Sequence, residues 1–206
     1  DATLLVPTEM VAMTISSSVE GNFSSPGTKA KEVAMLREAF LQAAAYREKM
    51  ESKDSSKRPP RDLKMEMLAD MLKGEIPALI QANTATDIMS AIRLAKEFHL
   101  KLVLEGVAEG YRLIDEIKAS GASVIVHPTM ARPYGEMANM TLRNAAILTK
   151  AGIPVSIESG FEGYVPKTRV ILFEAAIAAA NELPYEEALK AITINPDNAT
   201  ALAYAA

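Results

Sequence analysis

Short apolar runs alternate with amphipathic segments from Glu75 toward the end of the chain. The runs are IPALIQAN, KLVLEG, ASVIV and IPVSI, and each is followed by a segment whose apolar residues have helical spacing. The runs are continuous, as in strands of a parallel sheet that are buried on both faces. The pattern therefore predicts an α/β protein with a parallel (β/α) TIM-barrel-type fold.

The expected elements follow from this alternation and from local breakers. Strands are predicted at residues 3–6, 11–15, 77–82, 101–104, 123–126 and 154–157, and helices at 28–48, 62–73, 84–98, 109–119, 142–151, 169–181, 185–191 and 196–204. A closed barrel needs about 250 residues, and this chain has 206. We therefore expect one incomplete barrel domain over residues 1–206, with the charged, Ser-rich residues 51–60 as a flexible linker inside it.

Composition excludes several classes of protein. The net charge is −4 and the basic residues form only one short run, KRPPR, so nucleic acid is not an expected partner. There is no apolar run of about 18 residues to cross a membrane, and no cysteine for disulfides or thiolate chemistry. The chain opens on Asp1 without a signal-peptide pattern. A soluble protein of the cytoplasm or periplasm, processed or excised from a longer chain, is expected.

Polar side chains follow the predicted strands, where a barrel places its chemistry. His127 closes the VIV run, and it is a candidate general base or ligand. Equally, it is a side chain that only bonds the following loop around Pro128. Glu105 and Glu158 each end an apolar run. They are candidates for acid–base work or cation binding, although carboxylates at such positions more often accept backbone N–H groups. His99, at a helix end, is expected to serve only the helix dipole.

Basic and aromatic residues occupy the loops after the last two predicted strands: Arg132, Tyr134, Tyr164, Lys167 and Arg169. In barrels these loops often bind anionic groups, so a small carboxylate-bearing ligand is one hypothesis. The other is that Lys167 and Arg169 pair with nearby acids such as Glu162 or Glu174, and it is slightly favoured.

From Ile76 to about Ala203 the chain resembles the amidohydrolase superfamily, most closely its imidazolonepropionase and prolidase-like members. The resemblance rests on IPALIQANTATDIMSAIRLAKEFHLKLVLEGVAEGYRLIDEIKASGASVIVHPTM, on NAAILTKAGIPVSIESG and on LPYEEALKAITINP. The segment TKAKEVAMLREAFLQAAAYREKM is similar to the helix ahead of the fifth barrel strand in that family. The resemblance implies the later strands of an amidohydrolase barrel and a hydrolase of C–N bonds.

The resemblance also implies where metal ligands belong, at the ends of barrel strands five, six and eight. Those places hold Gln81, Gly106 and Gly160 in this chain. Glutamine is a poor ligand for transition metals and glycine has no ligating side chain. A bound divalent metal (zinc, iron or manganese) is therefore expected only if other residues rebuild the site, and Gln81 is retained as a binding candidate.

Two functions remain open at this point. The chain is either an amidohydrolase-like hydrolase with altered activity, or an inert barrel-type binding or scaffold protein. The latter would recognise a small carboxylate or a partner subunit. A homo-oligomer, or the remainder of a longer chain, is expected to cover the open edges of an incomplete barrel.

Overall fold

The computed structural model describes residues 10–20, 26–162, 165–166 and 168–196. Its centre is one parallel sheet in which five strands lie in sequence order. They are β1 (Val11–Thr14), β2 (Ala78–Ala82), β3 (Leu102–Gly106), β4 (Ser123–Val126) and β5 (Val155–Ile157). The predicted strand at 3–6 and the predicted helix at 196–204 lie wholly or almost wholly outside the described residues.

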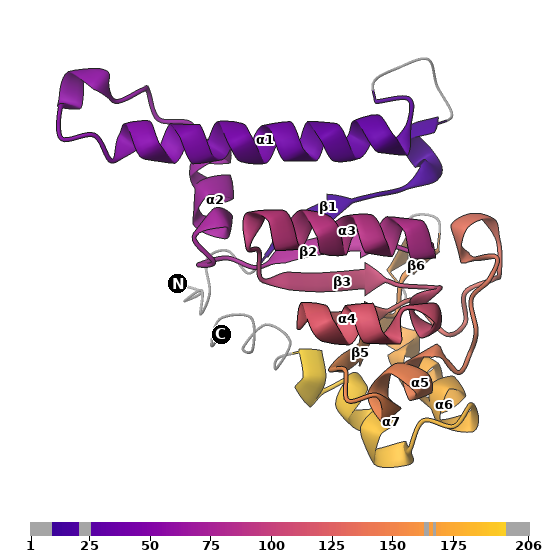
Figure 1. The fold of residues 1–206 in the computed structure, drawn as a ribbon. Coiled ribbons are helices and arrows are strands. Elements are labelled where there is room, and N and C mark those ends of the chain that lie inside the picture. The colour runs from indigo at the N-terminus through magenta and orange to yellow at the C-terminus, as the bar shows by residue number, and fades with distance from the viewer. Residues whose placement is uncertain (1–9, 21–25, 163–164, 167, 197–206) are drawn as a thin grey trace.

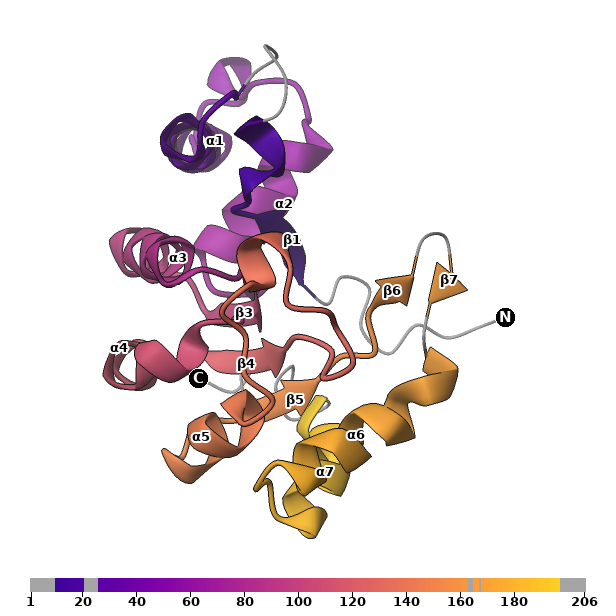
Figure 2. The same cartoon turned by 90° about the vertical axis from the view of Figure 1, so that its right-hand side faces the viewer.

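Helices connect the successive strands. These helices are α3 (Ala85–Phe98), α4 (Ile114–Ser120) and α5 (Asn144–Lys150), and β5 is followed by α6 (Ile171–Ala180) and α7 (Tyr185–Ala191). Figure 2 shows that α3, α4 and α5 all lie on one side of the sheet. The strand side chains beneath them form the core, and Ile80, Leu104 and Val124 are fully buried.

The other side of the sheet is called the inner face here. Because strand side chains alternate between faces, it carries the residues between the core positions, such as Gln81, Glu105 and Ile125, which are only half-buried. Within the described residues, β1 and β5 each pair with one neighbouring strand, so the sheet is not closed. The prediction of a parallel α/β sheet is confirmed, and a closed barrel is not.

Before β2 the chain forms the two helices α1 (Lys29–Met50) and α2 (Leu63–Leu72). Thr28 caps α1, as its Oγ1 accepts the N–H of Lys31 at 3.2 Å. Figure 1 shows α1 as a long rod lying along α3 at the edge of the molecule. Residues 51–60 join α1 to α2 and include a 3-10 turn at Ser55–Lys57; their flexibility stays a prediction.

Two segments differ from the sequence-based expectation. The predicted helix at 109–119 is split into a 3-10 turn, Gly110–Arg112, and α4, with a break at Leu113. The segment after β5, expected as a loop, contains the two-residue strands β6 (Phe161–Glu162) and β7 (Val165–Pro166), which pair antiparallel. Neither strand is long enough to show alternation in the sequence. No helix in the described part of the chain is long and apolar enough to cross a membrane.

Candidate active site

The strand register brings three predicted residues to the same end of the inner face. Glu105 lies in register with Gln81 and Ile125. The ladder continues past the strand ends, because the N–H of His127 donates to Gly106 O at 2.9 Å and that of Glu158 to Val126 O at 3.2 Å. His127 and Glu158 are therefore one register row beyond Val126 and two beyond Ile125, which returns their side chains to the inner face.

Glu105 and Glu158 lie within hydrogen-bonding reach of each other, although β4 separates their strands. Burial is the largest cause that raises the pKa of Glu158, and it reaches about 8 with the added negative charge of Glu105 and a side-chain hydrogen bond to it. Two carboxylates this close cannot both ionise without strong repulsion. Near neutral pH Glu158 therefore keeps its proton.

His127 is 2% exposed, and its ring is held in one tautomer. Nδ1 lies 2.9 Å from the carbonyl oxygen of Pro128. A carbonyl oxygen can only accept, so Nδ1 carries the proton and donates it. Burial lowers the pKa of His127, outweighing the hydrogen bond to Pro128 and the charge of Glu174. The neutral ring leaves Nε2 as a bare acceptor, and this buried atom has no hydrogen-bond partner.

Glu174, on α6, is a fully buried member of the same site that the sequence analysis did not propose. Its Oε2 accepts from Thr129 Oγ1 at 2.7 Å and from the N–H of Met130 at 2.8 Å. Its Oε1 is buried without a partner. The negative charge of Glu174 acts on both His127 and Glu158. We call Glu105, His127, Glu158 and Glu174 the strand-end cluster.

A signal for Glu174 is present in the sequence. It is the single charged residue of the helix ILFEAAIAAA, and a lone carboxylate in an apolar helix is expected to face a polar site. Glu174 joins none of the ion pairs among the described residues. Lys167 lies outside the described residues, so its pairing with Glu174 stays a prediction.

Of the other predicted site residues that the structure describes, Gln81 lies beside the cluster, in register with Glu105. Gln81 is on the inner face of β2 and half-buried, while Arg132 and Arg169 are exposed. Tyr134 is 84% exposed. Tyr164 and Lys167 lie outside the described residues, so their predicted role in ligand binding stays a prediction. His99 is the C-cap of α3, in the left-handed conformation, and its predicted role toward the helix dipole stays a prediction.

Side-chain ligands do not fit at two of the three positions where the resemblance implies them. Gly106 has φ +85°, and a Cβ there would lie 2.5 Å from Asn83 Oδ1. Gly160 has φ +67°, and a Cβ there would lie 2.5 Å from Pro128 Cγ. Within the described residues no group of three His, Asp or Glu side chains is placed to hold a metal ion. The donor set therefore does not fit the divalent metal that the resemblance implies.

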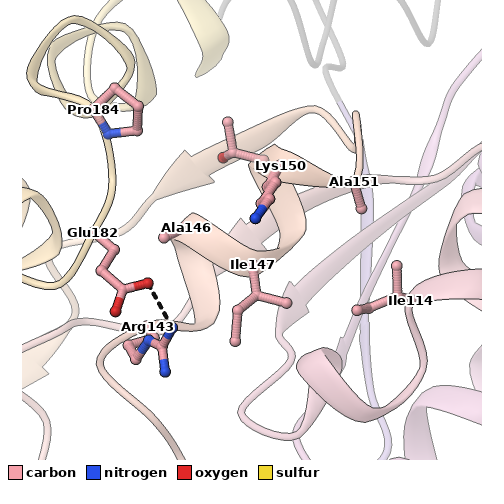
Figure 3. A pocket seen from close by; sticks show the side chains of 9 residues that line it. Ile114, Arg143, Ala146, Ile147, Lys150, Ala151, Glu182 and Pro184 are labelled. Atoms are coloured by element: carbon pink, nitrogen blue, oxygen red, sulfur yellow. Dashed lines mark hydrogen bonds and ion pairs between the residues drawn. The ribbon is translucent and has the colours of Figure 1, made fainter.

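A separate hollow of about 550 Å³ lies over α5, beside α4 and the α6–α7 connection. Figure 3 shows Arg143 just before the start of α5 and Lys150 at its end, with Glu182 facing Arg143. The ion pair of Arg143 and Glu182 is 2.5 Å long and exposed on both sides. Because α5 covers the face opposite the inner face, this hollow is distinct from the strand-end cluster.

The fold is similar to that of a solved amidohydrolase. The structure of the amidohydrolase from Thermotoga maritima MSB8 matches with a TM-score of 0.86 and 27% sequence identity, over 95% of this chain and 52% of that one. This chain thus spans about half the length of that protein. No protein-family model and no curated protein matches the chain. The chain has an amidohydrolase-like fold.

Proposed function

We propose that the chain is an amidohydrolase-like hydrolase of C–N bonds, non-peptide or peptide-like, in which the Glu105–Glu158 pair performs the proton transfers. The imidazolonepropionase or prolidase-like subtype is part of the proposal and rests on the sequence resemblance. The fold shared with the Thermotoga maritima amidohydrolase supports the class. The observation that carries the chemistry is the placement of Glu105 and Glu158 within reach of each other at the carboxyl ends of parallel strands, where burial and the charge of Glu105 raise the pKa of Glu158 to about 8.

The two carboxyl groups have different roles because their protonation differs. Glu105, as the charged partner, accepts a proton from a water molecule, and the resulting hydroxide attacks the carbon of the scissile C–N bond. Glu158 holds its proton near neutral pH, since its pKa is about 8, and it donates that proton to the leaving nitrogen. The C–O bond forms, the C–N bond breaks, and the proton on Glu105 returns to Glu158 to reset the pair. An acid and a base with separated proton affinities suit this reaction.

This mechanism includes no metal step, because the residues at the implied ligand positions do not suit one. Gln81, Gly106 and Gly160 occupy the three positions where the resemblance implies metal ligands. Gln81 remains able to hydrogen-bond a substrate from the neighbouring strand. Altered or weak activity relative to a metal-dependent amidohydrolase is the expected consequence.

The second candidate is an inert binding or scaffold protein with the same architecture. The close contacts of Gly106 with Asn83 and of Gly160 with Pro128 favour it, since they exclude ligating side chains at these positions. Such a protein would recognise a small carboxylate or a partner subunit. A carboxylate would bind away from the strand-end cluster, whose negative charge repels it, and near Arg132, Arg169 or the hollow lined by Arg143 and Lys150.

The test is amine or ammonia release from a panel of cyclic and acyclic amides, with and without a metal chelator. We expect turnover that survives the chelator and falls by about 100-fold or more in Glu158→Gln, the usual contribution of a positioned acid. Glu116→Gln, an exposed Glu on α4, is the matched control and should keep full activity. Turnover that disappears with the chelator, or equal rates in wild type and Glu158→Gln, contradicts the mechanism. No turnover on any amide favours the binding protein.

A further inference from the structure

Two members of the strand-end cluster are closed off from solvent by the loop that follows β4. His127 is 2% exposed and Glu174 is fully buried, so a substrate that is to touch either side chain must first uncover it. Nδ1 of His127 bonds the carbonyl of Pro128, and Oε2 of Glu174 accepts from Thr129 Oγ1 and from the N–H of Met130. The first three residues of the loop therefore lie directly on both side chains.

The same loop crosses the carboxyl ends of the strands before the chain enters α5. We call residues 128–138 the strap. Figure 1 shows the loop, in orange-red, beyond the arrowheads of β2 and β3, and Figure 2 shows it running from β4 to the level of β1 and back to α5. The N–H of Ser17, just after β1, donates to Glu136 Oε1 at 2.5 Å. The strap therefore reaches from β4 to β1 over the end of the sheet where the cluster lies.

Glu136 and Asn139 fasten the far end of the strap. Glu136 Oε1 lies 2.7 Å from Nζ of Lys29, in the first turn of α1, and the Glu136 side chain is only 16% exposed. Asn139 follows the strap. Its Nδ2 donates to Glu109 Oε1 at 2.5 Å, and its carbonyl oxygen accepts from Tyr111 Oη at 3.1 Å. Contacts to other elements therefore fix the strap at both of its ends.

The middle of the strap has no such contacts. Within the part of the chain that the structure describes, the hydrogen bonds of residues 131–135 stay inside the strap, as with the Ala131 N–H and Pro128 O at 3.1 Å. The side chains of Arg132 and Tyr134 are exposed, that of Tyr134 by 84%. A segment with fixed ends and an exposed middle can move without breaking the hydrogen bonds of the sheet or the helices.

We propose that the strap is a lid over the strand-end cluster, and that the Glu136–Lys29 ion pair is the latch that keeps it closed. Release of the latch frees the middle of the strap, and loss of the Thr129–Glu174 hydrogen bond then lifts residues 128–130 from the cluster. The inference rests on the proposed function in taking the cluster as the reacting site, and it adds control of access to that site. Such a lid excludes water from the reacting groups until it opens.

The alternative is a rigid loop that only completes the fold. The two differ in the effect of breaking the latch. A rigid loop without its ion pair loses stability but still covers His127, because Thr129 and Met130 keep their bonds to Glu174. A lid without its latch opens more often while the sheet stays folded, and His127 is then reached from solvent.

The test uses the two histidines of the chain as reporters. Diethyl pyrocarbonate modifies neutral imidazole rings, and peptide mass spectrometry follows each ring separately in the full chain. His99 is exposed and His127 is buried, so in wild type His99 should react first. Glu136→Ala removes the latch and should raise the modification rate of His127 by about tenfold or more, as expected for the loss of a charged hydrogen bond. The rate of His99 should not change.

Glu66→Ala is the matched control. Glu66 forms an ion pair of the same length, 2.7 Å, but on α2 and away from the strap, so its loss should leave the His127 rate unchanged. Thr129→Val removes the hydroxyl group that bonds Glu174 and should raise the rate as Glu136→Ala does. Hydrogen exchange separates lid opening from global unfolding, since in Glu136→Ala we expect faster exchange in the strap and unchanged exchange in β3.

Two results would overturn the inference. One is an unchanged His127 rate in Glu136→Ala, or in Thr129→Val if the first variant does not fold, as judged by far-UV circular dichroism. The other is an increase that also occurs in Glu66→Ala or is accompanied by faster exchange in β3, which would assign it to global unfolding. The modification needs no substrate. An opening lid without amide turnover therefore counts against the proposed function alone, and turnover with an immobile strap counts against this inference alone.

Discussion

At the scale of single residues, alternation along the strands decides which candidates meet. Glu105, His127 and Glu158 were identified because each follows an apolar run, and the register places all three on the inner face. Glu174 was missed because its partner Thr129 is 45 positions away in the chain. Periodicity can show that a carboxylate in an apolar helix is unusual, but it cannot show which loop that helix will contact.

The raised pKa of Glu158 predicts a pH-dependent stability. An unfolded chain releases this proton near pH 4.5 and the folded chain near 8. Between these values the folded state holds one proton more than the unfolded state. The free energy of unfolding therefore falls as pH rises, by at most about 1.4 kcal/mol per pH unit. Below pH 6.5 the lowered pKa of His127 acts in the opposite direction, so the informative window is pH 6.5–8.

Urea unfolding at several pH values in that window measures the slope. Glu158→Gln should be flatter than wild type, because its side chain has no proton to lose. Glu116→Gln should keep the wild-type slope. Parallel slopes for wild type and Glu158→Gln would show that Glu158 ionises normally in the folded protein.

At the scale of elements, Lys29 forms ion pairs that connect α1 with α3 and with the loop after β4. Nζ of Lys29, in the first turn of α1, lies 2.7 Å from Asp87 of α3 and 2.7 Å from Glu136 in the loop after β4. Burial alone would lower the pKa of Lys29, but the hydrogen bonds to both carboxylates together raise it. The backbone N–H of Ser17 also donates to Glu136. This network holds the start of α1 against the sheet layer.

Lys29→Met should therefore be costly. It would leave Asp87, whose side chain is 4% exposed, without its cation. Breaking a buried pair in this way typically costs about 3–5 kcal/mol. Because Lys29 is partly exposed, the expected loss in the free energy of unfolding is about 3 kcal/mol. The matched control is Arg37→Met, which breaks an α1–α3 pair with Glu97 that is exposed on both sides. That loss should be below about 1 kcal/mol. Chemical denaturation measures both, and equal losses would contradict the assignment.

The helix predicted at 109–119 is interrupted because its first residue makes contacts with distant segments. Glu109 is 6% exposed, and its carboxylate accepts the N–H of Ala85 at 2.8 Å and Asn139 Nδ2 at 2.5 Å. Glu109 therefore caps α3 instead of starting a regular helix of its own. The apolar spacing of residues 109–119 contains no sign of this, because both partners come from other segments.

At the scale of the whole molecule, the described strands form an open sheet. The outer edge of β5 is partly covered, since Asn195 Nδ2 donates to Val155 O at 2.7 Å, while the inner face leaves Leu79 and Ile125 only half-buried. Unpaired strand edges favour association with further strands. The matched Thermotoga maritima amidohydrolase is about twice as long as this chain. In a protein of that length, additional residues can cover the inner face and the open edges of the sheet.

We predict that the 206-residue chain self-associates in solution. Light scattering after size-exclusion chromatography should give a mass above the 22.2 kDa of one chain, increasing with protein concentration. Leu79→Lys would place a charge on the inner face and should shift the population toward monomer. Ile194→Lys, at an exposed apolar residue beyond α7, is the control for an added lysine. A concentration-independent monomer would show that the open sheet is stable without a covering surface.

The sequence by itself determined the parallel α/β order, the positions of the five strands of the main sheet and of most described helices, and three members of the strand-end cluster. These follow from local rules: apolar runs make buried strands, Thr28 and Thr84 cap helices, and strand ends carry polar residues. Only the tertiary structure decided that burial and the nearby Glu105 raise the pKa of Glu158, that Glu174 approaches them from α6, and that Nε2 of His127 is buried without a hydrogen-bond partner. Those properties depend on distances and burial between segments far apart in the chain, which no local pattern encodes.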